Sequence, residues 1–319
     1  MTARVFIDGA AGTTGLEIAD RLAGRAEFEL LILDDASRKS PQARQDALRA
    51  ADFAVLCLHD DAAREAVAMA EGSKVRIIDA STAHRVAPGW TYGLPEVTGR
   101  EAVANAARVA NPGCYPTGFI ALLAPLVRAG LLPADWPYTV NAVSGYSGGG
   151  KALIARFEED ADIAFRTYGL AMGHKHVPEM QAYAGLAHAP VFAPSVIPAH
   201  RGMVVEVPLP LAAMPGAATP EALRDCLKAF YADSAVVGVC EETPDELLLR
   251  RSAAPWDGLA LSVFAARDGT QARLVAVLDN LGKGASGAAV QNLNLMAGLP
   301  ETAGLELARE APGDSPASA

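Results

Sequence analysis

The sequence RVFIDGAAGTTG at residues 4–15 is the strongest indication of how the first part of this chain folds. Residues 4–7 predict a buried strand, and the turn that follows leads into a helix predicted over residues 14–23. Glycines in such a turn let the backbone approach a pyrophosphate, and the first amides of the helix attract its charge. The spacing G-x-x-G-x-x-G departs from the usual G-x-G-x-x-G, so a plain tight turn is the alternative. The candidate cofactor residues of this turn are Gly9, Gly12, Thr13, Thr14 and Gly15.

The pattern continues outward from this turn as an alternation of strands and helices. Apolar runs follow at residues 28–33, 53–58 and 75–78, separated by polar-faced segments suited to helices at residues 41–49 and 61–71. Continuous apolar strands separated by helices indicate a parallel sheet covered on both faces. The first part of the chain is therefore predicted to be an α/β domain with a Rossmann-type doubly wound sheet.

The pattern changes beyond residue 114, where strands cluster with fewer helices between them. Strands are predicted at residues 138–143, 191–197, 203–207, 259–266 and 273–278, and helices at residues 151–165, 178–186, 220–231 and 285–296. This order is typical of an α+β domain with a largely antiparallel or mixed sheet. The tail from Ala311 is rich in Pro, Gly, Ser and Ala and is expected to be disordered.

The end of the second predicted strand bears on the choice of nicotinamide cofactor. Asp34 and Asp35 lie where a carboxylate would bind a ribose hydroxyl, which favours NAD. Ser37, Arg38 and Lys39 follow at once and offer a cationic site for a 2′-phosphate, although a solvated charged loop would look the same. Because arginine and lysine together suit a phosphate better than a bare hydroxyl, the sequence favours NADP(H).

The sequence NPGCYPTG at residues 111–118 places Cys114 between a Pro-Gly turn and an apolar helix predicted over residues 119–127. The amides and dipole of a helix N-terminus are expected to lower the pKa of the thiol and to hold an oxyanion formed by attack of the sulfur on a carbonyl. A buried structural cysteine after a turn is the alternative interpretation.

Other polar clusters fit a reaction at Cys114. His174, His176 and Glu179 offer a general base and a carboxylate to orient it, and no third ligand set suggests a metal. Small residues at 279–287 permit either close helix packing or an approach to a nicotinamide, with Asn280, Lys283 and Gly284 as candidate cofactor residues. Arg201 is a weaker anion-binding candidate. The amides, hydroxyls and lysine of residues 144–151 would suit an anionic group such as a phosphate, although a simple flexible connector is the alternative. Arg85 is a candidate clamp for a carboxylate or phosphate. The candidate substrate-binding residues are Ser81, Arg85, Asn111, Ser144, Ser147 and Lys151.

Length and composition limit the classes of function. A chain of 319 residues is long enough for two domains, and a formal net charge of -10 argues against a nucleic-acid or anionic-membrane partner. The four cysteines form no C-x-x-C pair. Without a charged and apolar leader or an apolar run of membrane-spanning length, the chain is expected to be cytoplasmic.

Several of these segments together are specific, and the chain resembles the short-type N-acetyl-gamma-glutamyl-phosphate reductases over essentially its whole length. The segments that carry the resemblance are residues 9–15, 79–85, 92–96, 111–118, 143–151, 174–179 and 279–294. The cysteine octapeptide and the final segment are the most specific. The glycine turn is shared with the aspartate-semialdehyde dehydrogenases, whose catalytic domain the second domain is expected to resemble.

The resemblance implies NADPH-dependent reduction of an acyl phosphate to an aldehyde in arginine biosynthesis, through a thioester on Cys114. It implies an NADP-binding domain of residues 1–114 and 284–319, a catalytic and oligomerisation domain of residues 115–283, and a homodimer or homotetramer. His176 is favoured as the base, with His174 in a supporting role facing the oxyanion.

Three alternatives remain open on sequence grounds. An aspartate-semialdehyde dehydrogenase-like enzyme would use the same chemistry on a shorter acid. A non-catalytic NADPH-binding sensor would use Cys114 as a redox switch. A cysteine hydrolase would need the thiol and histidines but would leave the glycine turn and Arg38 without a purpose.

Overall fold

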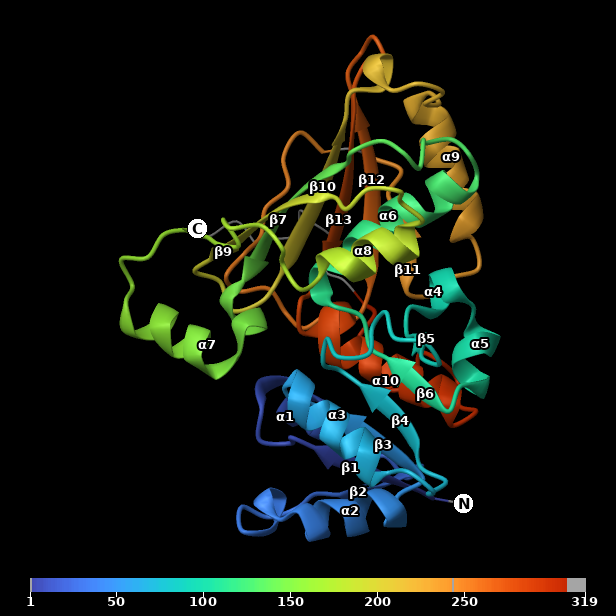
Figure 1. Ribbon diagram of the computed structural model, residues 1–319. Coiled ribbons are helices and arrows are strands. Elements are labelled where there is room, and N and C mark those ends of the chain that lie inside the picture. Colours follow the sequence, from blue (N-terminus) through green and yellow to red (C-terminus); the bar gives the residue numbers. More distant parts are fainter. Residues whose placement is uncertain (1, 243, 309–319) are drawn as a thin grey trace.

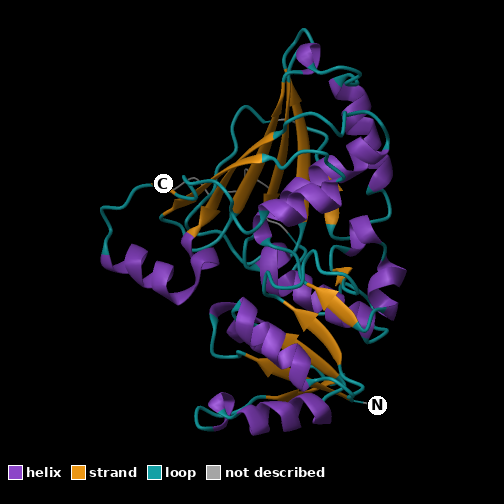
Figure 2. Ribbon diagram, viewed as in Figure 1, coloured by secondary structure: helices purple, strands orange, loops and turns teal. Residues whose placement is uncertain are grey.

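The chain folds around two β-sheets, one formed by its first third and one by most of the remainder (Figures 1 and 2). The computed structural model describes residues 2–242 and 244–308. The tail expected to be disordered, from Ala311 onward, lies outside these residues.

The first sheet is six-stranded and parallel, in the order β2-β1-β3-β4-β6-β5. This confirms the doubly wound α/β prediction. The elements of this part are β1 (Ala3–Asp8), α1 (Thr13–Leu22), β2 (Phe28–Leu31), the 3-10 turn η1 (Ser37–Lys39), α2 (Pro41–Ala50), β3 (Phe53–Leu56), α3 (Asp60–Met69), β4 (Arg76–Asp79), β5 (Thr91–Tyr92), α4 (Pro95–Thr98), α5 (Arg100–Asn105) and β6 (Arg108–Ala110).

Alternate residues of the central strands of this sheet point to two separate cores. Phe6 packs with Leu48 of α2 and Val67 of α3, whereas Val5 lies on the opposite face. That opposite face is covered by α1 and by α10 (Gly287–Met296), the last helix, through residues such as Leu293. The last helix therefore returns to the first domain, as Figure 1 shows.

The second sheet is seven-stranded and mixed, in the order β11-β12-β13-β10-β7-β9-β8. The pairs β11–β12 and β7–β9 are parallel, and the other neighbours are antiparallel. Its elements are α6 (Cys114–Arg128), β7 (Thr139–Gly145), η2 (Tyr146–Gly149), α7 (Gly150–Glu159), β8 (Arg166–Thr167), α8 (Val177–Ala184), β9 (Val191–Ile197), β10 (Met203–Leu209), η3 (Leu211–Ala213), α9 (Pro220–Phe230), β11 (Val237–Val239), β12 (Leu259–Ala265), β13 (Ala272–Leu278) and the π-helix η4 (Gly282–Ser286).

The two faces of the second sheet differ. Helices α6, α8 and α9 cover one face and form the largest apolar core with it (Figure 1). On the other face, side chains toward one end of the strands, among them Thr139, Pro208 and Arg273, are exposed, whereas Ser262 and Val275 are buried. The exposed end of this face is therefore open to a further layer of protein.

Two helix boundaries differ from the sequence prediction by five residues or more. Helix α7 ends at Glu159 instead of residue 165, because the Asp160 carboxylate accepts the N–H of Asp162 and holds a turn that competes with the helix. Helix α6 begins at Cys114, five residues before its apolar run. Pro116 is compatible with this early start, because a residue in the first turn has no intrahelical acceptor for an N–H.

Candidate active site

Cys114 is the first residue of α6 and follows the short loop after β6, which we call the cysteine turn (Asn111–Cys114). Gly113 leaves space for three side chains to converge on this turn. A Cβ atom at Gly113 would lie 2.6 Å from Arg85 Nη1, 2.7 Å from His176 Nε2 and 2.8 Å from Glu179 Oε1. Glycine is needed here for close approach, and not for an unusual backbone angle, since its φ is -73°.

The pKa of Cys114 differs from the sequence prediction, because it is raised and not lowered. Cys114 as a residue is only half-buried, but burial of its thiol is the strongest influence and raises the pKa to about 11. The positive charge of Arg85 and the N–H groups of Cys114 and Tyr115 act in the opposite direction. The helix N-terminus therefore stabilises the thiolate, but by less than desolvation destabilises it.

The two predicted histidines lie together beside the cysteine turn. His176 is the N-cap residue of α8, and its backbone N–H donates to His174 Nδ1 at 3.2 Å. His176 is buried, and its Nδ1 has no hydrogen-bond partner among the described residues. Since His174 Nδ1 accepts a hydrogen bond, a neutral His174 carries its proton on Nε2.

Both imidazoles are held neutral near pH 7. Burial lowers the pKa of His176 well below its usual 6.5, and the positive charges of Arg85 and Lys175 add to the effect. Burial also lowers the pKa of His174, to about 4, with Lys175 and Arg85 as further causes. A neutral imidazole beside a thiol can accept a proton, which is what a general base requires.

Glu179 does not orient a histidine, contrary to the sequence prediction. Its carboxylate accepts hydrogen bonds from Arg85 Nη1 at 2.7 Å, from the Tyr92 hydroxyl at 2.7 Å and from the Gly113 N–H at 3.1 Å. The side chain is only 1% exposed. Glu179 thus holds the backbone of the cysteine turn, because it binds the amide that precedes Cys114.

Arg85, expected to clamp the substrate, is occupied by protein groups. In addition to its ion pair with Glu179, its Nε donates to the Asn111 carbonyl at 3.0 Å and its Nη2 to the Ala80 carbonyl at 3.3 Å. The structure therefore places Arg85 beneath the cysteine turn as a buried cation.

Two further predicted substrate residues are tied into the fold. The Ser81 hydroxyl donates to Asp79 Oδ2 at 2.8 Å. The Asn111 amide donates to the Ala285 carbonyl at 3.0 Å and accepts from Asn292 Nδ2 at 3.0 Å, so it joins the cysteine turn to the last helical segment.

The sequence of residues 144–151 predicts an anion-binding segment. The Ser144 hydroxyl donates to the Gly145 carbonyl, while that of Ser147 donates to the His200 carbonyl and accepts from Asn280 Nδ2 at 2.9 Å. Lys151 is exposed in the first turn of α7. Ser147 and Asn280 therefore join two loops of the second domain to each other, and Lys151 is the most accessible of the predicted anion-binding groups in this segment.

The glycine turn, which we call the cofactor turn (Gly9–Gly15), has the geometry its spacing suggests. Gly9 has a φ of +89°, and a Cβ there would lie 2.3 Å from the Cys57 carbonyl oxygen. A Cβ at Gly15 would lie 2.4 Å from the Gly9 carbonyl oxygen. Helix α1 begins at Thr13, so its unpaired first amides border the turn. The cofactor turn fits a pyrophosphate placed against the N-terminus of α1.

The cationic group after β2 lies in η1. Arg38 is 45% exposed and forms an ion pair with Asp35 at 2.8 Å, while Asp34 accepts the Ser37 N–H at 2.7 Å. The first carboxylate thus shapes the turn, and the second partly neutralises the arginine. Lys39 lies in the same turn.

Lys283, a predicted cofactor residue, is buried in a network of protein groups. Its ammonium donates to Glu96 Oε1 at 2.7 Å and to Gln291 Oε1 at 2.6 Å. Its neighbour Gly284 lies against Cys114, since a Cβ there would be 2.9 Å from Cys114 Cβ. The small residues of this segment thus permit close packing beside Cys114, whereas Lys283 points into the protein.

Two residues at this site have no role predicted from the sequence: Tyr92, which binds Glu179, and Glu96, which binds Lys283. Both residues lie in the segment 92–96, which carries part of the family resemblance, so the resemblance could have indicated that they belong to the site.

Among residues 2–242 and 244–308, no group of three or more His, Cys, Asp or Glu side chains is placed to hold a metal ion. Within these ranges, no helix has the length and apolar character to cross a bilayer.

Two family models match the chain, and each covers one of the two sheets. Residues 4–106 match the family model described as the semialdehyde dehydrogenase NAD binding domain, and residues 114–280 match the semialdehyde dehydrogenase dimerisation domain. Aspartate semialdehyde dehydrogenase II of Vibrio cholerae has a similar structure, with a TM-score of 0.70, 18% identity and coverage of 93% of this chain and 98% of that chain. The Candida albicans enzyme with NADP has a TM-score of 0.65 at 14% identity, covering 93% and 98%. At such identities the likeness shows the shared fold.

Other relatives have much higher sequence identity to this chain. N-acetyl-gamma-glutamyl-phosphate reductase 2 of Pseudomonas putida is 50% identical over 302 residues, covering 92% of this chain and 96% of the relative. N-acetyl-gamma-glutamyl-phosphate reductase of Rhizobium meliloti is 50% identical over 307 residues, covering 93% and 99%. The chain therefore belongs to the N-acetyl-gamma-glutamyl-phosphate reductase family.

Proposed function

We propose that this protein reduces N-acetyl-gamma-glutamyl phosphate to N-acetyl-L-glutamate 5-semialdehyde with NADPH and releases phosphate, in arginine biosynthesis. The relatives at 50% identity are named N-acetyl-gamma-glutamyl-phosphate reductases, which supports this substrate and a reduction. The observation in the structure that carries the proposal is the convergence of a neutral, buried His176 and the cation Arg85 on the residue before Cys114.

The first step is acyl transfer to sulfur. Cys114 Sγ attacks the acyl carbon while His176 Nε2 takes the thiol proton, the carbon–oxygen bond to phosphate breaks, and the proton passes to the departing phosphate. Because the thiol is protonated at neutral pH, this proton transfer accompanies the attack instead of preceding it. The Arg85 charge favours the anionic sulfur as the thiol loses its proton.

The second step reduces the thioester and releases the aldehyde. NADPH, when bound, supplies the hydride that adds to the thioester carbon. Collapse of the resulting adduct breaks the carbon–sulfur bond and returns Cys114 as a thiolate, which is reprotonated from solvent through His176. His174 supports this site by accepting the His176 backbone N–H, so it fixes the start of α8.

For the cofactor, the cofactor turn holds the pyrophosphate against α1, and Ser37, Arg38 and Lys39 hold the 2′-phosphate. The steric fit at Gly9 supports the first assignment, because any side chain there would collide with the Cys57 carbonyl. The exposure of Arg38 supports the second. Lys151 is the residue best placed by its exposure to attract the substrate phosphate.

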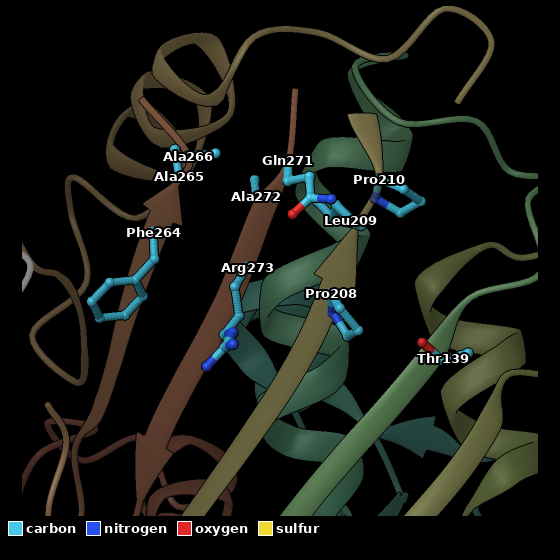
Figure 3. Close-up of a pocket in the computed structure, with 10 residues that line it drawn as sticks. All are labelled: Thr139, Pro208, Leu209, Pro210, Phe264, Ala265, Ala266, Gln271, Ala272 and Arg273. Atoms are coloured by element: carbon cyan, nitrogen blue, oxygen red, sulfur yellow. The ribbon is translucent and has the colours of Figure 1, made fainter. Parts of the chain in front are cut away.

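We further propose a homodimer or homotetramer assembled through the open face of the second sheet. Figure 3 shows this face, where Phe264, Arg273, Pro208 and Thr139 line a depression of about 510 Å³ on four strands. The match to a dimerisation domain supports the assignment. Light scattering should then return a mass of two or four chains.

We also propose that residues 1–114 and 284–319 form the NADP-binding domain and that residues 115–283 form the catalytic and oligomerisation domain. We propose that the enzyme works in the cytoplasm, with other biosynthetic enzymes.

The test of the activity is the reverse reaction, followed as NADP reduction. N-acetylglutamate semialdehyde should support NADP reduction only when phosphate is present, because phosphate must cleave the thioester. Faster turnover of aspartate semialdehyde would identify the enzyme as an aspartate-semialdehyde dehydrogenase instead. Reversible oxidation of Cys114 without any phosphate-dependent NADP reduction would identify an NADPH-binding sensor.

A further inference from the structure

A chain of alternating charges crosses from the cofactor domain to the catalytic domain. Arg201 donates to Asp279 Oδ2 at 2.8 Å and to Glu17 Oε1 at 2.9 Å. Glu17 also lies 3.7 Å from Arg21 Nε, and Arg21 Nη1 donates to Asp257 Oδ2. We call these five residues, Asp279, Arg201, Glu17, Arg21 and Asp257, the charge chain.

The charge chain is unlike the ion pairs on the surface of the protein. Asp257 is fully buried, the side chains of Arg201 and Arg21 are nearly so, and Glu17, the most accessible member, is 24% exposed. Burial of so many charges costs free energy, and an apolar contact of similar size would often be as stable. What buried ion pairs provide instead is a fixed geometry between the groups they join.

One end of the charge chain reaches the segment that abuts the nucleophile. Asp279 Oδ1 accepts the Leu281 N–H at 2.9 Å, and the Asp279 carbonyl accepts the Gly284 N–H at 3.0 Å. Gly284 lies directly against Cys114. The conformation of this segment therefore depends on Asp279, which Arg201 holds.

The other end lies on the helix that borders the cofactor turn. Glu17 and Arg21 are one turn apart on α1, which begins at Thr13 directly after Gly12. Both side chains reach across to the second domain, so α1 is held at two points along its length. Displacement of α1 would move the amides assigned to the cofactor pyrophosphate.

We propose that Arg201 is a positioning residue that fixes α1, and with it the bound cofactor, relative to Cys114. The inference rests on the proposed function, because it concerns hydride transfer to a thioester on Cys114. It also gives Arg201 a role other than anion binding, since its guanidinium is shared between two protein carboxylates. A misalignment of about 1 Å at a distant site can reduce turnover roughly a hundredfold, so rigid alignment has catalytic value.

The test compares Arg201→Met, Arg201→Lys and Glu17→Gln with the wild type, and with Arg49→Met as a control at an exposed position in the last turn of α2. Arg201→Met should lower kcat roughly tenfold or more. The dissociation constant of NADPH and the rate of Cys114 alkylation by iodoacetamide should change little. The kinetic isotope effect with 4-deuterated NADPH should rise, because a slower hydride transfer becomes more rate-limiting.

A double-mutant cycle separates positioning from stability. If Arg201 acts through Glu17, the loss in kcat from Arg201→Met plus Glu17→Gln should be smaller than the product of the two single losses. Arg201→Lys, which keeps one charge but cannot reach both carboxylates in the same geometry, should recover only part of the rate.

Three results for folded Arg201→Met would overturn the proposal. These are an unchanged kcat, a fall in the rate of Cys114 alkylation as large as the fall in kcat, and an unchanged kinetic isotope effect. Should Arg201→Met fail to fold, the isotope effect of the milder Glu17→Gln variant decides the question. The failure of the proposed function is distinguishable, because in that case the wild-type protein itself shows no phosphate-dependent NADP reduction.

Discussion

The cofactor turn and the cysteine turn both lead from a parallel strand into a helix, yet they are built in different ways. The cofactor turn is a backbone structure, in which Gly9 and Gly15 remove side chains that would collide with carbonyl oxygens. The cysteine turn depends on side chains, because Arg85, His176 and Glu179 reach it from two other segments. The cofactor turn therefore depends on the absence of side chains within the turn itself. The cysteine turn depends on side chains from residues distant in the sequence.

The largest effect is expected from Cys114→Ala. Removal of the sulfur leaves nothing to form the thioester, so turnover should be lost completely. NADPH binding should remain nearly intact, because the cofactor turn contributes its contacts independently of the thiol. Activity assays together with fluorescence titration of NADPH check both halves of this expectation.

Cys240→Ala is the matched control for that variant, since Cys240 is also partly exposed but lies after the edge strand β11. It should keep full activity. Turnover by Cys114→Ala would mean that the nucleophile is assigned wrongly, and a joint loss of NADPH binding would mean that the two turns are not independent.

The protonation state of Cys114 gives the second-largest expected effect. With a thiol pKa of about 11, the thiolate fraction of the free enzyme should rise about tenfold per pH unit through the neutral and mildly alkaline range. Alkylation of Cys114 by iodoacetamide, followed by mass spectrometry of its peptide, should therefore increase up to pH 10 without a plateau.

A plateau near or below pH 8.5 would show that the cysteine turn stabilises the thiolate more than burial destabilises it. The helix N-terminus would then dominate, as the sequence suggested. The Cys240 peptide in the same digests reports any change in the reagent itself.

Glu179→Gln tests whether the cysteine turn depends on its buried ion pair. The change leaves Arg85 buried with an uncompensated charge and weakens the hydrogen bond to Gly113, so it should lower the free energy of unfolding by about 3–5 kcal/mol. Urea denaturation measures this. The alkylation rate of Cys114 should change as well, because the turn loses its anchor.

Glu241→Gln is the comparison for that variant, since Glu241 forms an ion pair of 2.6 Å with Lys228 but is 77% exposed. Its loss should cost about 0–1 kcal/mol. Equal losses for the two variants would refute the role of Glu179 as a buried anchor.

The contrast between the turns also explains how much the sequence could predict. The local sequence pattern predicts the cofactor turn, the doubly wound sheet and the position of Cys114 at the start of a helix. The structure and the comparisons confirm the predicted fold. The partners of Glu179 could not be inferred, because residues 85, 92 and 113 meet only after β4, β5 and β6 pair in one sheet. A carboxylate three residues after a histidine suggested a local pair, but at the first turn of α8 it points toward the cysteine turn instead.

The same reasoning accounts for the thiol and for Lys283. A helix N-terminus is visible in sequence, whereas the burial that outweighs it depends on the packing of the whole site. Lys283 lies shortly after Asn280 in a segment whose sequence predicts a contact with the cofactor. The segment forms a π-helix, which directs the Lys283 side chain toward Glu96. Very short strands such as β5 and β6 also gave no periodic signal of their own.

The smallest expected effect concerns the cofactor side of the comparison. Arg38→Ala should weaken NADPH binding about tenfold while leaving NADH binding nearly unchanged, because only NADPH carries the 2′-phosphate that a charge-assisted hydrogen bond can reach. The effect is modest because Arg38 is 45% exposed and already paired with Asp35 three residues before it. Arg64→Ala on α3 is a closely matched control, since Arg64 is 54% exposed and pairs with Asp61 at the same spacing and a similar distance, 2.9 Å. Calorimetric titration with NADPH and with NADH measures both affinities. If Arg38→Ala lowers the two affinities equally, η1 is a solvated loop and does not bind the 2′-phosphate. If Arg38→Ala and Arg64→Ala weaken NADPH binding equally, the effect comes only from the long-range charge.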